Sequence, residues 1–528
     1  MSAPAAELSG VGTRLPLSPR WSRRLILLAT LLCAICGFVY ELVIVAMGTV
    51  LLGSSTAQTA MVLGTFVAAM GAGSWLATKL PRSRPIEFFV VVEGAVALLG
   101  GLSAMALFAA FAWLDLYEPT VRALSVVLGV LVGAEIPLLT AIVGRIRAEA
   151  ADQTIGTLLA ADYVGAFVVG LAFPLYLLPA VGRIDAALIF GAVNVVGGGM
   201  VLWLMRRQVS RRALGWLTAG LAGVLVLLGV AGAEARAFEV SARQVLYDDP
   251  IVHTEQTRHQ EITLTRSRDG RDLRLFLNGD LQFSSLDEHR YHESLVHPAM
   301  SGPHQRVLVL GGGDGLALRE VLRYEGVKEV VEVELDQRMI ELARDRPDLR
   351  ALNAAALDDP RVRVVVADAF KWLREGSERF DVVIVDFPDP DSEDLAKLYS
   401  TELYSMVARR HLTPAGRMVV QSGSPYFAPE AFWGIEATVR AAGLGVVPYH
   451  VDVPSFGDWG FVLAAAGAPP ALALEAPPAG LRFLDDEVLE AARAFPPDRS
   501  RAAYEDVGPS TLDRPAIVEY SRRGWRDE

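Results

Sequence analysis

RVLVLGGGDG, residues 306–315, places four apolar residues directly before a glycine-rich loop. A short apolar run that ends in glycines is typical of a strand buried in a parallel sheet. Residues 316–325 then show a helical pattern, and residues 329–333 form a second apolar strand that ends at Glu334. This strand–loop–helix–strand order predicts an α/β domain built on a doubly wound parallel sheet.

Acidic residues follow the predicted strands at the points where the strands end. They are Asp314, Glu334, Asp368 and Asp386. Ligands of doubly wound sheets bind at the carboxyl ends of the strands, so we expect these side chains to line one site. Gly311 and Gly313 let the backbone approach a ligand closely, and an acid about 20 residues after the loop suits a ribose diol. The pattern predicts a nucleoside site.

The charge of this site narrows the class of nucleoside. Several carboxylates repel a pyrophosphate and attract a cation. A sulfonium nucleoside with a cationic second substrate is therefore favoured over a dinucleotide. A methyltransferase on the same fold remains an alternative at this point, although Asp386 followed by Asp389 favours an amine acceptor.

The segment before the glycine loop reads as a small antiparallel sheet. Residues 261–265 alternate, residues 273–277 form a second strand, and Asn278-Gly279 is a turn signal. A helix is expected over residues 287–299.

The first half of the chain has a different composition. The 528 residues are 52% hydrophobic, with a mean hydropathy of +0.33, and the long apolar runs all lie within residues 25–232. This excludes a wholly soluble enzyme, a disordered chain and a small disulfide scaffold, and the net charge of −12 argues against nucleic acid as a partner. Seven stretches are long enough to cross a lipid bilayer: 25–52, 57–78, 86–113, 120–144, 156–178, 184–205 and 213–232. We predict a multi-pass protein of the cell membrane.

Polar residues inside these runs have two interpretations. The acids Glu41, Glu93, Glu135 and Asp162 either line a path for a cation or polyamine, or hold helices together as protonated or hydrogen-bonded carboxyls. Cys33 and Cys36 form a CxxC pair without nearby Cys or His ligands in the sequence, so we predict a packing role and no metal site. A membrane transporter or sensor with a soluble polyamine-binding domain is a second alternative.

The chain resembles the spermidine synthases, the polyamine aminopropyltransferases, and its apolar half resembles their membrane-bound branch. The resemblance covers about residues 245–465. It is carried by five segments in the family's order: 259–262 (HQEI), 287–293 (DEHRYHE), 311–320 (GGGDGLALRE), 333–336 (VELD) with 368–369 (DA), and 386–390 (DFPDP).

The resemblance implies roles for individual residues. Asp386 resembles the general base. The resemblance implies contacts to decarboxylated S-adenosylmethionine or methylthioadenosine for four residues: Gln260, Glu334, Asp368 and Ala369. Four others resemble the polyamine subsite: Tyr291, His292, Asp314 and Asp389. The sequence departs from the family at Phe387-Pro388, at residues 391–394, and at Phe456, which replaces a tyrosine.

The implied reaction moves an aminopropyl group from decarboxylated S-adenosylmethionine to an amine, with putrescine as the expected acceptor. The partners expected are a diamine, a nucleoside and the bilayer, in a homo-oligomer, with no cofactor and no metal. The implied domains are a tail (1–24), a seven-helix transmembrane domain (25–232), a β-hairpin subdomain (243–300), a Rossmann-like catalytic domain of the class I methyltransferase type (301–465) and a C-terminal extension (466–528).

Lys and Arg gather in the N-terminal tail and in alternate connections between the spans, which predicts a cytoplasmic N-terminus. Seven crossings then place the catalytic domain on the far side of the membrane. If the nucleoside is cytosolic, the catalytic domain must lie in the cytoplasm, which requires an even number of crossings or a re-entrant segment.

Overall fold

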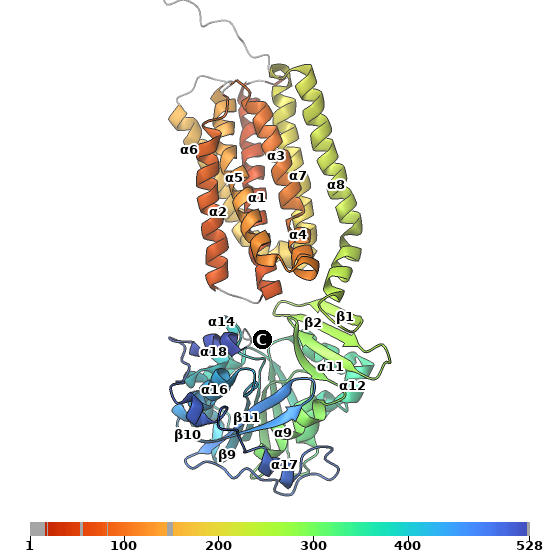
Figure 1. The fold of residues 1–528 in the computed structure, drawn as a ribbon, viewed down its shortest axis with the longest axis vertical. Helices are drawn as coiled ribbons and strands as arrows, with labels where there is room; N and C mark the ends of the chain where they lie inside the picture. The colour runs from red at the N-terminus through yellow and green to blue at the C-terminus, as the bar shows by residue number, and fades with distance from the viewer. Residues whose placement is uncertain (1–15, 18, 53–55, 82, 145–150, 525–528) are drawn as a thin grey trace, which may run out of the picture. The chain divides into compact units, whose positions relative to one another are not determined.

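The computed structural model describes residues 16–17, 19–52, 56–81, 83–144 and 151–524. It divides into two compact units, Met1–Asp248 and Asp249–Glu528 (Figure 1). Most of the predicted N-terminal tail lies outside the described residues, as do the cationic residues Arg14, Arg82, Arg145 and Arg147 that enter the topology prediction.

The first unit is a bundle of long helices. They are α1 (Pro19–Leu52), α2 (Thr56–Ala77), α3 (Pro85–Gly101), α4 (Ser103–Ala109), α5 (Tyr117–Gly144), α6 (Ala151–Ala172), α7 (Leu178–Met205) and α8 (Arg211–Gln244). Within the described residues, six helices are long and apolar enough to cross a membrane. A bent pair, residues 85–101 and 103–114, meets the same test only when its two helices are taken together.

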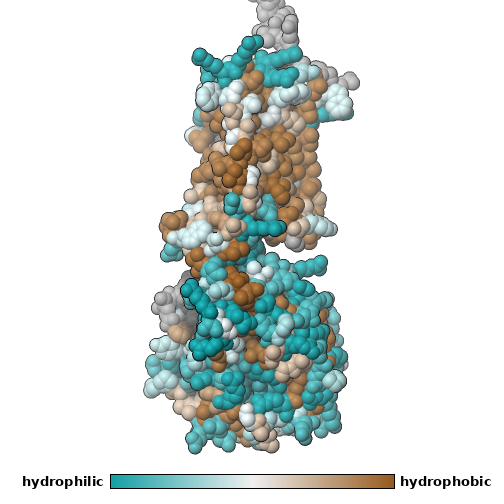
Figure 2. Space-filling model, turned by 90° about the vertical axis from the view of Figure 1, so that its right-hand side faces the viewer, coloured by the Kyte–Doolittle hydropathy of each residue, from teal (hydrophilic) through white to brown (hydrophobic). Residues whose placement is uncertain are grey.

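The seven predicted spans therefore map onto these six helices and this bent pair. The two helices of the pair meet at Leu102 at an angle of 44°, so the predicted stretch 86–113 is not one straight helix. On the face shown in Figure 2, hydrophobic side chains cover the middle of the bundle and hydrophilic side chains lie at its ends. This distribution suits helices that are surrounded by lipid.

The second unit begins with a four-stranded antiparallel sheet in the order β1-β2-β3-β4. Its strands are β1 (Ile251–Gln256), β2 (Glu261–Arg266), β3 (Leu273–Leu277) and β4 (Asp280–Ser284). Helix α9 (Glu288–Met300) follows. The predicted small antiparallel sheet and the helix after it are both confirmed.

The main sheet has seven strands in the order β10-β11-β9-β8-β5-β6-β7. They are β5 (Arg306–Gly311), β6 (Glu329–Glu334), β7 (Val362–Val366), β8 (Phe380–Asp386), β9 (Leu412–Gln421), β10 (Leu444–Val453) and β11 (Gly457–Ala466). Strands β5 to β9 are parallel, as predicted, but β11 runs antiparallel to both β9 and β10. The sheet is mixed because the short connection 454–456 can join β10 to β11 only as a hairpin.

Helices cover both faces of this sheet. Alternate residues of β5 enter different cores: Val307 and Val309 pack with α9 and α10 (Leu316–Leu322), whereas Leu308 and Leu310 pack with the helices of the other face. The remaining helices are α11 (Gln337–Asp345), α12 (Pro347–Leu352), α13 (Ala369–Glu375), α14 (Glu393–Ala396), α15 (Thr401–Met406), α16 (Pro429–Ala441), α17 (Asp486–Ala491) and α18 (Ala516–Gly524).

The C-terminal extension packs on this unit. The Glu293 carboxylate of α9 accepts the backbone N–H groups of Arg482, Phe483 and Leu484 at 2.8–2.9 Å. Farther on, α18 packs against α16. The extension thus satisfies a buried charge of the α/β unit and covers part of its surface.

Candidate active site

The glycine loop after β5 lies directly against the ends of its two neighbouring strands. Gly311 and Gly312 have φ angles of 78° and 72°. A Cβ atom at Gly311 would lie 2.2 Å from the carbonyl oxygen of Asp386, and one at Gly313 would lie 2.8 Å from Cγ of Glu334. Glycine is required because β8 and β6 place these two acids against the loop.

Asp386 ends the buried strand β8 and is held by a residue from α9. The Tyr291 hydroxyl donates a hydrogen bond of 2.5 Å to Oδ1 of Asp386. Burial raises the pKa of Asp386, while nearby His292 and the hydrogen bond from Tyr291 lower it, and the pKa stays above its ordinary value. A buried carboxylate with a raised pKa is a stronger base than an exposed one, once it is ionised.

His292 lies one residue after Tyr291 and is fully enclosed. Its Nδ1 lies 2.7 Å from the Glu288 carbonyl oxygen and 3.1 Å from Oε2 of Glu288. Burial lowers the pKa of His292, but Glu288 more than compensates, so its pKa lies above the ordinary value.

An ion pair anchors this part of α9 to α10. The Arg319 guanidinium donates to both carboxylate oxygens of Glu288, at 2.9 and 2.8 Å. Burial raises the pKa of Glu288, but hydrogen bonds from His292 and Arg319 lower it to about 2. The bidentate Glu288–Arg319 ion pair thus joins two of the segments that carry the resemblance, 287–293 and 311–320, and it orients His292.

Asp314 lies in the glycine loop and is the third ionisable side chain of this region, with Asp386 and His292. Its Oδ1 accepts the Leu316 N–H at 2.8 Å, at the start of α10. Burial raises the pKa of Asp314 to about 6, with His292 lowering it and Asp386 raising it. Asp314 and Asp386 both raise the pKa of His292, so these three side chains lie near one another.

Glu334 and Gln260 are brought together by the loop after β6. Oε1 of Glu334 accepts the Asp336 N–H at 2.8 Å, and burial raises the pKa of Glu334 to about 7. The Thr257 hydroxyl lies 2.6 Å from Oδ2 of Asp336 and accepts the Gln260 N–H at 3.1 Å. The β1–β2 turn that carries Gln260 is therefore tied to the residues that follow Glu334.

Asp368 lies beyond the next strand, β7, and already has partners in the chain. Its Oδ1 accepts the Lys371 N–H at 3.0 Å, which caps α13, and Lys397 Nζ lies 2.6 Å from its Oδ2. Burial raises the pKa of Asp368, but Lys397 and the backbone donors outweigh it, so the pKa lies below its ordinary value. Ala369 is buried as the first residue of α13. Nucleoside contacts by these two residues stay predictions, and Lys397 was not anticipated.

Asp389 is oriented by Gln421, the last residue of β9. The Gln421 side-chain nitrogen lies 3.0 Å from Oδ1 of Asp389 and 2.6 Å from the Phe387 carbonyl oxygen. Burial raises the pKa of Asp389 to about 6, with a lowering by Gln421 and a further rise from Asp391. We did not single out Gln421 from the sequence, although a polar residue directly after the apolar run 418–420 was an available signal.

Asp280, at the start of β4, lies near two further carboxylates, those of Asp389 and Asp391. Desolvation, followed by repulsion from Asp391 and Asp389, raises the pKa of Asp280 to about 7. The repulsion requires the three carboxylates to lie near one another, although the Asp280 side chain itself is exposed. Because Asp280 belongs to the antiparallel sheet, only the tertiary structure could reveal this neighbourhood.

The two aromatic departures from the family have different positions. Phe387 is buried against Tyr399, with ring centroids 6.4 Å apart. Phe456 packs edge-on against Tyr291, with centroids 5.8 Å apart. Phe456 thus places an apolar ring beside the tyrosine that holds Asp386, which bears on the choice of amine.

The α/β unit and the chain as a whole are similar to known proteins. Residues 288–474 match the family model described as "Spermine/spermidine synthase domain". The chain is 55% identical to polyamine aminopropyltransferase 1 of Streptomyces coelicolor, covering 96% of both chains. It is 48% identical to the polyamine aminopropyltransferase of Mycobacterium tuberculosis, covering 96% of this chain and 97% of the other.

Among solved structures, spermidine synthase from Thermotoga maritima matches 47% of this chain and 84% of that chain, with 27% identity and a TM-score of 0.43. The near full-length relatives decide the assignment. The α/β unit is that of an aminopropyl-transferring enzyme. The chain belongs to the polyamine aminopropyltransferase family.

Proposed function

We propose that this enzyme transfers the aminopropyl group of decarboxylated S-adenosylmethionine to putrescine, forming spermidine and releasing methylthioadenosine. The observation that carries the proposal is the partly buried Asp386 carboxylate, held by Tyr291 against the glycine loop.

The reaction requires a neutral amine and a methylene group beside a sulfonium. An alkylammonium has an unperturbed pKa near ~10.4, so the acceptor arrives protonated. Asp386 accepts its proton, the nitrogen lone pair attacks the methylene carbon, and the carbon–sulfur bond breaks with its electron pair returning to sulfur. Charge balances without a redox partner, because the sulfonium becomes a neutral thioether.

The nucleoside is assigned to the Glu334 side of the site. The ribose hydroxyls donate to the Glu334 carboxylate beside Gly313, and the β1–β2 turn with Gln260 covers this region. Asp368 and Ala369 lie beyond the end of the neighbouring strand β7, where the base would extend.

Two acidic groups support an acceptor that carries two ammonium groups. Asp314 and Asp386 make up the first group, because Asp386 lies near enough to raise the pKa of Asp314. Asp389, Asp391 and Asp280 form the second group. We assign the attacking amine to the first group and the distal ammonium to the second. The Arg522 guanidinium offsets part of the charge on Asp391, and a monoamine would add no second cation to balance Asp389 and Asp280.

The apolar helices support a location in the cell membrane for the whole enzyme. The homo-oligomeric state stays a prediction.

The test supplies the purified full-length protein with decarboxylated or intact S-adenosylmethionine and a panel of amines. We expect methylthioadenosine and spermidine from the decarboxylated nucleoside with putrescine. Release of S-adenosylhomocysteine from the intact nucleoside would instead identify a methyltransferase. Transfer to monoamines as fast as to putrescine would contradict the assignment of the second acidic group.

A further inference from the structure

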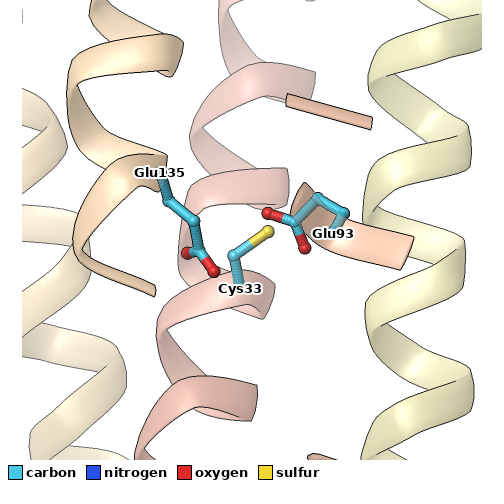
Figure 3. Close-up of side chains that lie close together, drawn as sticks. All are labelled: Cys33, Glu93 and Glu135. Atoms are coloured by element: carbon cyan, nitrogen blue, oxygen red, sulfur yellow. The ribbon is translucent and has the colours of Figure 1, made fainter. Parts of the chain in front are cut away.

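Three potential metal ligands meet inside the helical unit. They are Cys33 on α1, Glu93 on α3 and Glu135 on α5 (Figure 3). One ligand atom from each residue lies within 4.8 Å of the other two, and all three side chains are buried. Figure 3 shows the Cys33 sulfur between the two carboxylates.

The carboxylates in this cluster lack the hydrogen bonds that buried oxygens normally have. Both oxygens of Glu93, which is 0% exposed, and Oε1 of Glu135 have no hydrogen-bond partner among the described residues. The side-chain oxygen of Asn194 is equally unpartnered, and its amide nitrogen lies 3.3 Å from the Glu93 carbonyl oxygen. Unpaired buried acceptors cost free energy, so this arrangement calls for a bound cation or added protons.

We propose that Cys33, Glu93 and Glu135 bind one divalent metal ion of the zinc type. Zinc is bound by thiolate sulfur at about 2.3 Å and by carboxylate oxygen at about 2.0–2.2 Å, usually with four ligands. Tetrahedral ligands at these distances lie roughly 3.3–3.8 Å apart. The observed spacing therefore needs only a small contraction, and water or an amide oxygen supplies the fourth ligand.

A metal ion fits this cluster better than a polyamine does. Each residue offers one ligand atom, and these atoms lie within 4.8 Å of one another, a spacing that suits a single ion. A thiol is a poor partner for an ammonium group, whereas a thiolate is a strong ligand for zinc. Gly198 on α7 packs against Glu93, where a Cβ atom would lie 3.0 Å from the Glu93 Cβ. Because of this packing, the Glu93 carboxylate is held facing Cys33.

Cys36 provides an internal contrast one helical turn away. Its sulfur lies 3.4 Å from the Phe190 carbonyl oxygen, and it is not one of the three clustered ligands, although both cysteines belong to apolar cores of the bundle. The packing role predicted for the CxxC pair therefore fits Cys36, whereas Cys33 takes part in the metal site.

The test measures metal bound to the full-length protein, without a histidine tag, in detergent or lipid nanodiscs. After incubation with zinc and removal of weakly bound metal, we expect about one ion per chain in wild type and in Cys36→Ser. Cys33→Ser and Glu93→Gln should lose the ion. Methylthioadenosine binding by each variant reports whether the α/β unit is intact.

A second measurement detects the cysteine ligand directly in the wild-type protein. Cobalt in place of zinc should give a thiolate-to-cobalt charge-transfer absorption in the wild-type protein, which only a cysteine ligand produces. A wild type that binds no metal, or a Cys33→Ser variant that keeps both the metal and this absorption, would overturn the proposal. The first of these results would mean that Glu93 and Glu135 are simply protonated.

Discussion

The Tyr291 hydroxyl lies 2.5 Å from Oδ1 of Asp386, although the two residues are 95 positions apart in the sequence. The contact joins α9 to the end of β8 and fixes the orientation of the carboxylate that we assign as the general base.

Asp386→Asn should remove the proton acceptor while keeping the packing. We expect turnover to fall by about 10²–10⁴-fold with methylthioadenosine binding retained, measured by single-turnover transfer to putrescine. Asp381→Asn is the matched control, because Asp381 lies at the other end of β8 and accepts the backbone N–H groups of Gln305 and Arg306. It should lower stability and keep turnover per folded molecule. Near wild-type transfer by Asp386→Asn would refute the catalytic assignment.

Tyr291→Phe should shift the pH dependence of the reaction. The hydrogen bond from Tyr291 lowers the pKa of Asp386, so its loss raises that pKa and moves the acid limb of kcat/KM to higher pH. We expect a loss of about 10- to 100-fold below the shifted pKa and a partial recovery above it. Tyr449→Phe is the control, since the Tyr449 hydroxyl donates to the Ser294 carbonyl oxygen at 2.7 Å. A uniform loss at all pH values would mean that Tyr291 only supports the fold.

Glu334→Gln should weaken nucleoside binding. A hydrogen bond to a charged group contributes roughly 1.5–3 kcal/mol, so the Kd for methylthioadenosine should rise by about one to two orders of magnitude, as calorimetry would measure. Glu332→Gln is the control: Glu332 lies on the same face of β6, is 0% exposed and has a pKa raised well above its ordinary value by burial. Glu332→Gln should leave the Kd unchanged. An unchanged Kd in Glu334→Gln would assign Glu334 to structure.

The substrate-free enzyme should become less stable as pH rises from about 4 to 7, between the unfolded and the folded pKa values of its carboxyls with raised pKa. Burial raises the pKa of Asp314 and Asp389 to about 6 and that of Glu334 to about 7. A carboxyl whose pKa is raised by folding stabilises the fold below its unfolded pKa, and this contribution is lost as pH rises through its folded pKa. The Tm of the α/β unit should fall over this interval, and less so in Asp389→Asn. A Tm that rises instead would contradict these pKa directions.

The number of membrane crossings decides on which side the α/β unit lies. With a cytoplasmic N-terminus and seven crossings, reporters fused after residues 50 and 240 should be external, and one after residue 150 cytoplasmic. If the bent pair α3–α4 turns back instead of crossing, the reporters after residues 150 and 240 exchange sides. The latter pattern would disprove the seven-span prediction and give the enzyme direct access to a cytosolic nucleoside.

Local sequence determined much of this protein. Apolar runs of sufficient length predicted the membrane helices, and the period-2 and 3.6 patterns around Gly311 predicted the strands and helices of the α/β unit. The strand-end acids were visible because a residue that follows a buried parallel strand must emerge at the ligand-binding edge.

Other features depended on contacts between distant segments, which no local pattern encodes. The antiparallel edge of the main sheet, the Lys397–Asp368 ion pair and the approach of Asp280 to Asp389 all join residues from separate elements. Cys33 shows the difference most clearly. In the sequence it is paired with Cys36 in a CxxC spacing, but the packing of α1 against α3 and α5 places two carboxylates around its sulfur. Sequence periodicity fixes which face of a helix is apolar, whereas the side chains that meet across helices depend on how those faces pack.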